Sequence, residues 1–142
     1  MTYTDTANEV TSSNSTRSKW VNYGLWALQI LAALAFLAAG GTKLIGTERM
    51  IGLFAQIGGE LGTGQWFRIL TGLLEVSGAI MLLVPRTAWI GGLLLACVMV
   101  GAVFTHMFVI GGSFVPALVL LVVTAAIAWF RRPAATGSGR VR

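Results

Sequence analysis

The sequence predicts an all-α protein: a four-helix transmembrane bundle with a short amphipathic helix in the loop between the first and second spans. Of the 142 residues, 56% are hydrophobic and only 11% are charged, and the mean hydropathy is +0.79. So few charges cannot cover a surface that faces water. The apolar residues also fall into four blocks, each near the roughly 20 residues that a helix needs to cross a membrane. These blocks lack the alternation of lipid-facing strands, so helices are expected.

The expected spans are residues 23–44, 66–84, 88–110 and 113–130, and together they form one transmembrane domain over 23–130. The fourth span is near the short end of the usual range. Residues 1–22 are rich in Ser, Thr and Asn and are expected to form a disordered cytoplasmic tail. Residues 131–142 are expected to form a second, basic tail, because Arg131 and Arg132 end the last helix at the interface and Pro133 prevents its continuation.

The basic residues predict the orientation of the bundle. With an even number of spans, both termini share one side, which holds seven basic residues against three on the other: Arg17, Lys19, Arg86, Arg131, Arg132, Arg140 and Arg142 against Lys43, Arg49 and Arg68. This excess predicts that both termini are cytoplasmic in a multi-pass protein of the cytoplasmic membrane. Topology also explains the net charge of +5. Membrane lipid is therefore the expected surrounding, and no nucleic-acid partner is expected.

The loop between the first two spans carries its own helical pattern. Met50, Phe54, Ile57 and Leu61 recur at helical spacing. Thr47 is a candidate N-cap, and the glycines after Ile57 are candidate helix ends. An amphipathic helix that anchors in the membrane interface is the expected structure, and a lid folded over the mouth of the bundle is the alternative.

Glu75 is the candidate functional residue that the composition selects. A charge near the middle of a bilayer costs at least about 2.5–3.5 kcal/mol, so it is expected to face the bundle interior and to have a partner. Glu75 lies roughly 13 Å below the outer boundary of the second span. Lys43 at the end of the first span, Arg68 nearly two turns before Glu75, and His106 near the end of the third span are the candidate partners. All four residues are expected to converge in the outer half of the bundle.

Two stripes of residues predict how the helices pack. Lys43 shares a helix face with four residues that are expected to point inward: Gly40, Phe36, Ala33 and Gln29. On the third span, small residues recur every four positions and predict close helix approach: Cys97, Gly101 and Thr105, with Gly92 and Ala96 as a second pair.

Each candidate residue also has a purely structural interpretation. Glu75 paired with Lys43 or Arg68 would fix the register of two helices, and Arg68 is expected to extend to the lipid headgroups. His106 would hydrogen-bond a neighbouring helix. Cys97 is the only cysteine, so it is expected to be a packing residue without a disulfide. One histidine and one carboxylate are too few ligands to predict a metal site.

Three segments carry a family resemblance: "FLAAGGTKLIG", "GLLEVSGAIMLLVPR" and "GAVFTHMFVIGG". Over about residues 26–130 the chain resembles the DoxX family of small four-helix membrane proteins, and the motif positions correspond to Lys43, Glu75 and His106. Some members are similar to the membrane subunit of a thiosulfate:quinone oxidoreductase, and others are linked to membrane complexes that handle oxidative stress. The resemblance therefore implies a redox association.

The leading hypothesis is a small subunit or partner of a quinone-linked redox system. Glu75 and His106 would be the catalytic residues and exchange protons with a quinone, because imidazole gains and loses a proton near neutral pH. Lys43 or Arg68 would bind and hold Glu75 ionised. The candidate ligand is a quinone, and the candidate partner is a redox enzyme.

The alternative is a non-catalytic bundle that binds lipid or a small amphiphile, or that scaffolds a partner enzyme. A transporter is less favoured, because four short helices show no inverted pair of broken segments; it would need to form a homo-oligomer.

Overall fold

The computed structural model describes residues 3–59 and 63–133, and over these residues the chain is helical without strands. Five α-helices follow one another: α1 (Tyr3–Ile45), α2 (Glu48–Gly58), α3 (Gly64–Leu83), α4 (Ala88–Thr105) and α5 (Val115–Arg131). A π-helical turn, η2 (His106–Ile110), continues α4. The predicted all-α class is confirmed for the described part of the chain.

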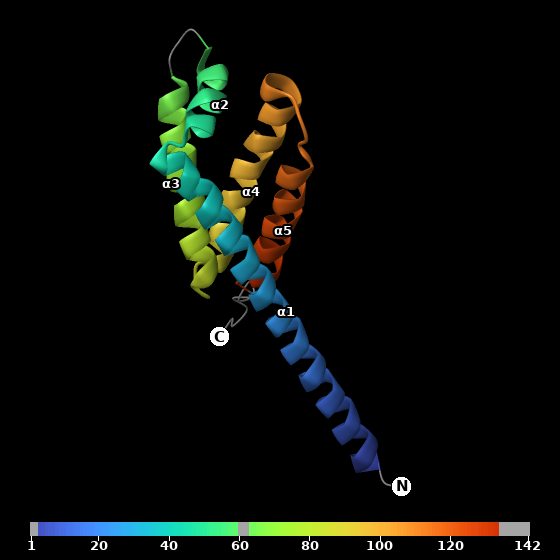
Figure 1. The fold of residues 1–142 in the computed structure, drawn as a ribbon. Coiled ribbons are helices and arrows are strands. Elements are labelled where there is room, and N and C mark those ends of the chain that lie inside the picture. The colour runs from blue at the N-terminus through green and yellow to red at the C-terminus, as the bar shows by residue number, and fades with distance from the viewer. Residues whose placement is uncertain (1–2, 60–62, 134–142) are drawn as a thin grey trace, which may run out of the picture.

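The helices run up and down in sequence order (Figure 1). α1 packs mainly against α3, α4 packs mainly against α5, and the contact between α3 and α4 joins the two pairs. The short α2 lies at the end of the bundle opposite the turn between α3 and α4, where it contacts α3 and η2. The N-terminal part of α1 extends away from the bundle.

Three helical segments are long and apolar enough to cross a membrane: Lys19–Ile45, Gly64–Leu83 and Ala88–Ile110. They correspond to the first three expected spans. α5 is an apolar helix of 17 residues, which agrees with the expectation that the fourth block is the shortest. Many large apolar side chains on these helices point outward and are exposed, such as Leu31, Leu93 and Val122. An outward apolar surface of this kind suits a lipid environment.

The start of α1 corrects the expected boundary of the first helix, which the sequence placed at Tyr23. The helix begins at Tyr3 and runs for 43 residues. No glycine or proline occurs between Tyr3 and Tyr23, so no residue in this stretch interrupts the backbone hydrogen bonds of the helix. At the other end, α5 stops at Arg131, immediately before Arg132 and Pro133, as predicted. The rest of the expected C-terminal tail, 134–142, lies outside the described residues.

The helices converge at the end of the bundle that holds the α3–α4 turn. Fully buried side chains from four helices meet there: Gln29, Leu82, Leu95, Thr124 and Ile127. Glycines permit this close approach, because a Cβ on Gly91 would lie 2.8 Å from the carbonyl oxygen of Gly78, and one on Gly92 would lie 2.9 Å from that of Thr124. The close approach predicted at Gly92 is thus confirmed. Toward α2 the two pairs of helices spread apart (Figure 1).

Candidate functional site

Glu75 and Lys43 form an ion pair between α3 and α1. The ammonium nitrogen of Lys43 lies 2.9 Å from Oε1 and 2.7 Å from Oε2 of Glu75. Glu75 is only 2% exposed, whereas the side chain of Lys43 retains 16% exposure. The charge that the sequence places inside an apolar helix therefore has a basic partner from the neighbouring helix, as the cost of an isolated charge requires.

A glycine crossing brings the two helices close enough for this pair. A Cβ on Gly40 would lie 2.9 Å from the carbonyl oxygen of Gly72 and 3.1 Å from Cβ of Glu75. Larger residues would force the backbones apart. The inward stripe of α1 is also confirmed, since Gln29, Ala33, Phe36 and Gly40 are buried and Lys43 lies at its end. The last turn of α1 is thereby directed at Glu75.

Arg68 does not pair with Glu75 and does not extend to the headgroups as expected. One guanidinium nitrogen, Nη1, donates a hydrogen bond to the carbonyl oxygen of Lys43. Its Nε donates to Oε1 of Gln65 at 2.9 Å. The carbonyls of a final helical turn have no partner within the helix, and their partial negative charge attracts a cation. Arg68 therefore caps the C-terminus of α1 and holds the backbone of the residue that pairs with Glu75.

His106 lies where α4 passes into the π-helical turn η2. It lines the same cavity as Lys43 and Glu75. Its Nδ1 is buried and has no hydrogen-bond partner among the described residues. Buried polar atoms nearly always have a partner, so this nitrogen is available to a group that enters the cavity.

The cavity lies between the α1–α3 pair and the α4–α5 pair and has a volume of about 480 Å³. Its walls are mainly apolar, and its polar side chains are few: Lys43, Thr71, Glu75, Thr105 and His106. Small-molecule sites typically combine such apolar walls with a few placed polar groups. The structure thus brings three of the four expected site residues, Lys43, Glu75 and His106, to one cavity, and it places Arg68 behind Lys43.

The α2 helix covers the cavity at its wide end. Met50, Leu53, Phe54 and Ile57 from its apolar face line the cavity, and Phe54 is buried. Met50, Phe54 and Ile57 belong to the predicted apolar pattern; Leu61, its fourth member, lies outside the described residues. Of the two positions considered for this helix, the structure shows the one folded over the bundle.

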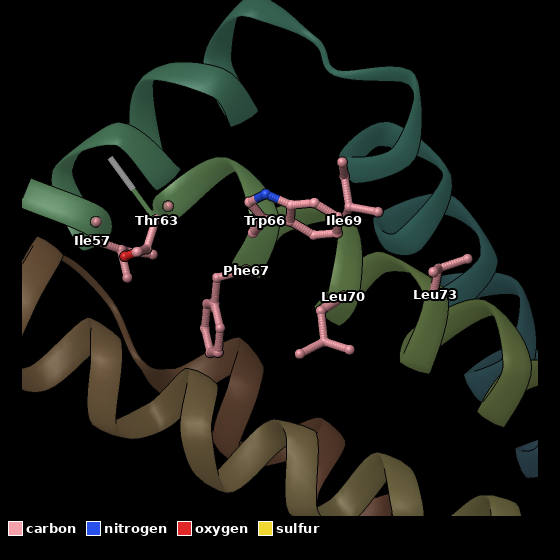
Figure 2. A pocket seen from close by; sticks show the side chains of 9 residues that line it. Ile57, Thr63, Trp66, Phe67, Ile69, Leu70 and Leu73 are labelled. Atoms are coloured by element: carbon pink, nitrogen blue, oxygen red, sulfur yellow. The ribbon is translucent and has the colours of Figure 1, made fainter. Parts of the chain in front are cut away.

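A second, apolar groove of about 480 Å³ lies where α2 meets α3. Figure 2 shows its lining, with the side chains of Phe67 and Leu70 directed toward α4. Ile57, Phe67 and Leu70 line both the groove and the cavity. These three side chains therefore form the partition between the two spaces.

The stripe of Cys97, Gly101 and Thr105 does not make the close helix contact that its spacing predicted. All three residues line the cavity. Cys97 is exposed, and a Cβ on Gly101 would meet nothing within 4 Å. Small side chains on α4 thus leave space for the cavity rather than admit a second helix.

A buried polar network at the converging end of the bundle was not predicted. The amide nitrogen of Gln29 donates to the carbonyl oxygen of Leu82, and its oxygen accepts a hydrogen bond of 2.7 Å from Nε of Arg131. Arg131 also donates to Asn22 at 3.1 Å and lies over the ring of Trp26. The available signal was Gln29 itself, a polar residue on the inward stripe of an apolar helix.

Among residues 3–59 and 63–133, no cluster of three or more His, Cys, Asp or Glu side chains could hold a metal ion. Neither the curated proteins nor the solved structures gave a match to this sequence. The sequence profile of the DoxX-like family, in contrast, matches residues 27–131. This range includes Lys43, Glu75 and His106, and extends from α1 to the end of α5. The long apolar helices fit an integral membrane protein, and the chain belongs to the DoxX-like family.

Proposed function

We propose that this protein is a small subunit or partner of a quinone-linked redox system in the cytoplasmic membrane. In this proposal four helices, α1, α3, α4 and α5, cross the membrane with both termini in the cytoplasm. The excess of Lys and Arg on the terminal side supports the orientation. The cavity and α2 then lie toward the outer leaflet, and reporter fusions after Arg86 and after Gly112 test the two sides directly.

The observation that carries the proposal is the apolar cavity with Lys43, Glu75 and His106 on its wall. Its volume of about 480 Å³ is within the range of about 300–1,000 Å³ that small-molecule sites occupy. A lysine ammonium has three N–H donors, and Glu75 accepts two of them. One donor of Lys43 and the unpartnered Nδ1 of His106 thus remain for the carbonyl oxygens of a quinone, while the apolar walls suit its ring and tail.

The chain's own residues would orient the ligand and transfer protons. A quinone takes up two protons with two electrons when it is reduced by a partner enzyme. His106 would donate or accept one proton at Nδ1, and Glu75 would exchange the other within a site that excludes water. Lys43 would keep Glu75 ionised between transfers through its two hydrogen bonds.

Replacement of Glu75 by Gln tests this role. The variant Glu75→Gln should insert normally, because it removes a charge from the membrane, but should abolish quinone-dependent turnover by membranes that contain the protein and its partner. Glu48→Gln removes an exposed carboxylate from α2 and is the matched control. Turnover that is unchanged in Glu75→Gln would eliminate the proposal.

A non-catalytic bundle that binds a lipid or another amphiphile, or scaffolds an enzyme, is the alternative. The predominance of apolar residues around both the cavity and the adjoining groove favours it. Purification in a mild detergent, followed by solvent extraction and identification of bound molecules, separates the two functions. Copurified quinone or a redox enzyme supports the first, and phospholipid alone supports the second.

A further inference from the structure

A continuous line of hydrogen bonds connects α2 with the ion pair in the cavity. Nε2 of Gln65 donates to the carbonyl oxygen of Ile51 in α2 at 3.0 Å. Oε1 of Gln65 accepts from Nε of Arg68 at 2.9 Å, and Arg68 donates to the carbonyl of Lys43. Lys43 then binds both carboxylate oxygens of Glu75. Residues near the start of α3 thus contact both α2 and the last turn of α1.

The chemistry of these groups fixes their orientation. A guanidinium has only donors, so the amide of Gln65 must turn its oxygen to Arg68 and its N–H group to Ile51. Reversal of the amide would place two donors together and lose both hydrogen bonds. Arg68 therefore determines which way Gln65 points, and Gln65 in turn fastens α2.

The connections of α2 allow it to change position as a unit. Gly46, between α1 and α2, has φ of +74°, and Gly59, after α2, has φ of +49°. Glycine adopts such values at little steric cost. Apart from the Gln65 bond, α2 is held by apolar contacts such as that between the rings of Phe54 and Phe67, whose centroids are 6.3 Å apart.

We propose that Gln65 and Arg68 are positioning residues that hold α2 closed over the cavity and Lys43 beside Glu75, so that α2 is a lid whose opening admits the ligand. The role of the ligand rests on the proposed function, whereas the fastening of α2 does not. Closure of the lid seals the wide end of the cavity with Met50, Leu53 and Phe54, while the same bonds fix the ammonium group.

The chain contains a natural reporter of lid opening. Cys97 is the only cysteine, and it lines the cavity that α2 covers. Its rate of modification by a membrane-impermeant, sulfonated maleimide, measured in outer-face-accessible membranes, reports how often water and reagent reach the cavity. The variant Cys97→Ser gives the background.

Gln65→Glu is the diagnostic variant, because it keeps the acceptor for Arg68 and removes the donor to Ile51. Loss of one hydrogen bond should raise the modification rate of Cys97 about two- to tenfold, and Arg68→Lys, which loses the fork, should raise it as well. Gln65→Met repeats the test with an uncharged side chain. Arg49→Gln removes a charge from the exposed face of α2 and should leave the rate unchanged.

Two results would overturn the proposal: an unchanged rate in the Gln65 variants that nevertheless melt at lower temperature, which means a purely structural bond, or an equal increase in Arg49→Gln, which means a charge effect. Decylubiquinone is then added as a probe of the ligand. Its protection of Cys97 tests the proposed function separately, since the lid can fail this test in neither direction.

Discussion

Removal of Lys43 should destabilise the protein more than removal of its partner, although both changes break the same ion pair. Lys43→Met leaves Glu75, which is 2% exposed, as a buried charge without its partner. Such a change typically costs about 3–5 kcal/mol. Glu75→Met leaves an ammonium that is 16% exposed and lies in the last turn of its helix. It can turn toward water, so the expected cost is about 1–3 kcal/mol.

The double variant Lys43→Met/Glu75→Met removes both charges and should be far more stable than either loss would indicate. Replacement of a buried ion pair by apolar residues of similar size is often neutral or stabilising. The coupling energy between the two sites should therefore far exceed the roughly 0.5 kcal/mol within which independent sites add.

Unfolding in mixed detergent micelles, with sodium dodecyl sulfate as the denaturant and helicity followed by circular dichroism, measures the four free energies. Glu48→Met and Arg49→Met, both at exposed positions of α2, serve as a control pair and should each change the free energy by no more than about 0.5 kcal/mol. Equal losses in the two single variants that simply add in the double variant would refute the reasoning, because they would show that the two charges do not depend on each other.

Three further changes test the packing. Gly40→Ala should cost about 1–3 kcal/mol of unfolding free energy, because its Cβ would lie 2.9 Å from a backbone oxygen, whereas Gly41→Ala meets nothing within 4 Å and should stabilise by about 0.5–1 kcal/mol. Gly46→Ala should cost about 1–2 kcal/mol, because the residue has φ of +74°. Gln29→Leu should cost about 1–3 kcal/mol for each group left without a partner, including the guanidinium of Arg131. All are measured by the same detergent titration.

The controls for these changes lie in α2. Gly52→Ala is a helical glycine substitution with nothing within 4 Å of the new Cβ, and Gln56→Leu removes an exposed amide. Neither should lower the free energy of unfolding appreciably. A Gln29→Leu variant as stable as Gln56→Leu would contradict the buried network, and a neutral Gly40→Ala would contradict the close crossing of α1 and α3.

The sequence predicted the helical class and the pairing of Glu75 with Lys43 because both follow from the cost of placing polar groups in an apolar environment. Backbone groups must be satisfied within helices, and an acidic side chain in such a helix needs a basic partner. The correct partner could be selected because few basic residues lie at the right depth. These predictions need no knowledge of detailed packing.

The role of Arg68 could not be predicted in the same way. Its acceptor is the backbone oxygen of Lys43, and a backbone carbonyl leaves no mark in the pattern of side chains. The link between Gln29 and Arg131 joins residues that are 102 positions apart, so it depends on how α1 and α5 pack. The spacing of Cys97 and Gly101 was ambiguous, since small side chains permit either a helix contact or a cavity.

The π-helical turn at His106–Ile110 has a consequence for how this chain tolerates change in length. Such a turn is equivalent to an α-helix with one surplus residue. Deletion of a single residue there would restore ordinary helical winding and rotate everything downstream by about 100°. His106 would keep its place, but Ile110 and Pro116, which face it across the cavity, would turn away. Insertions and deletions in this turn should therefore be selected against more strongly than substitutions.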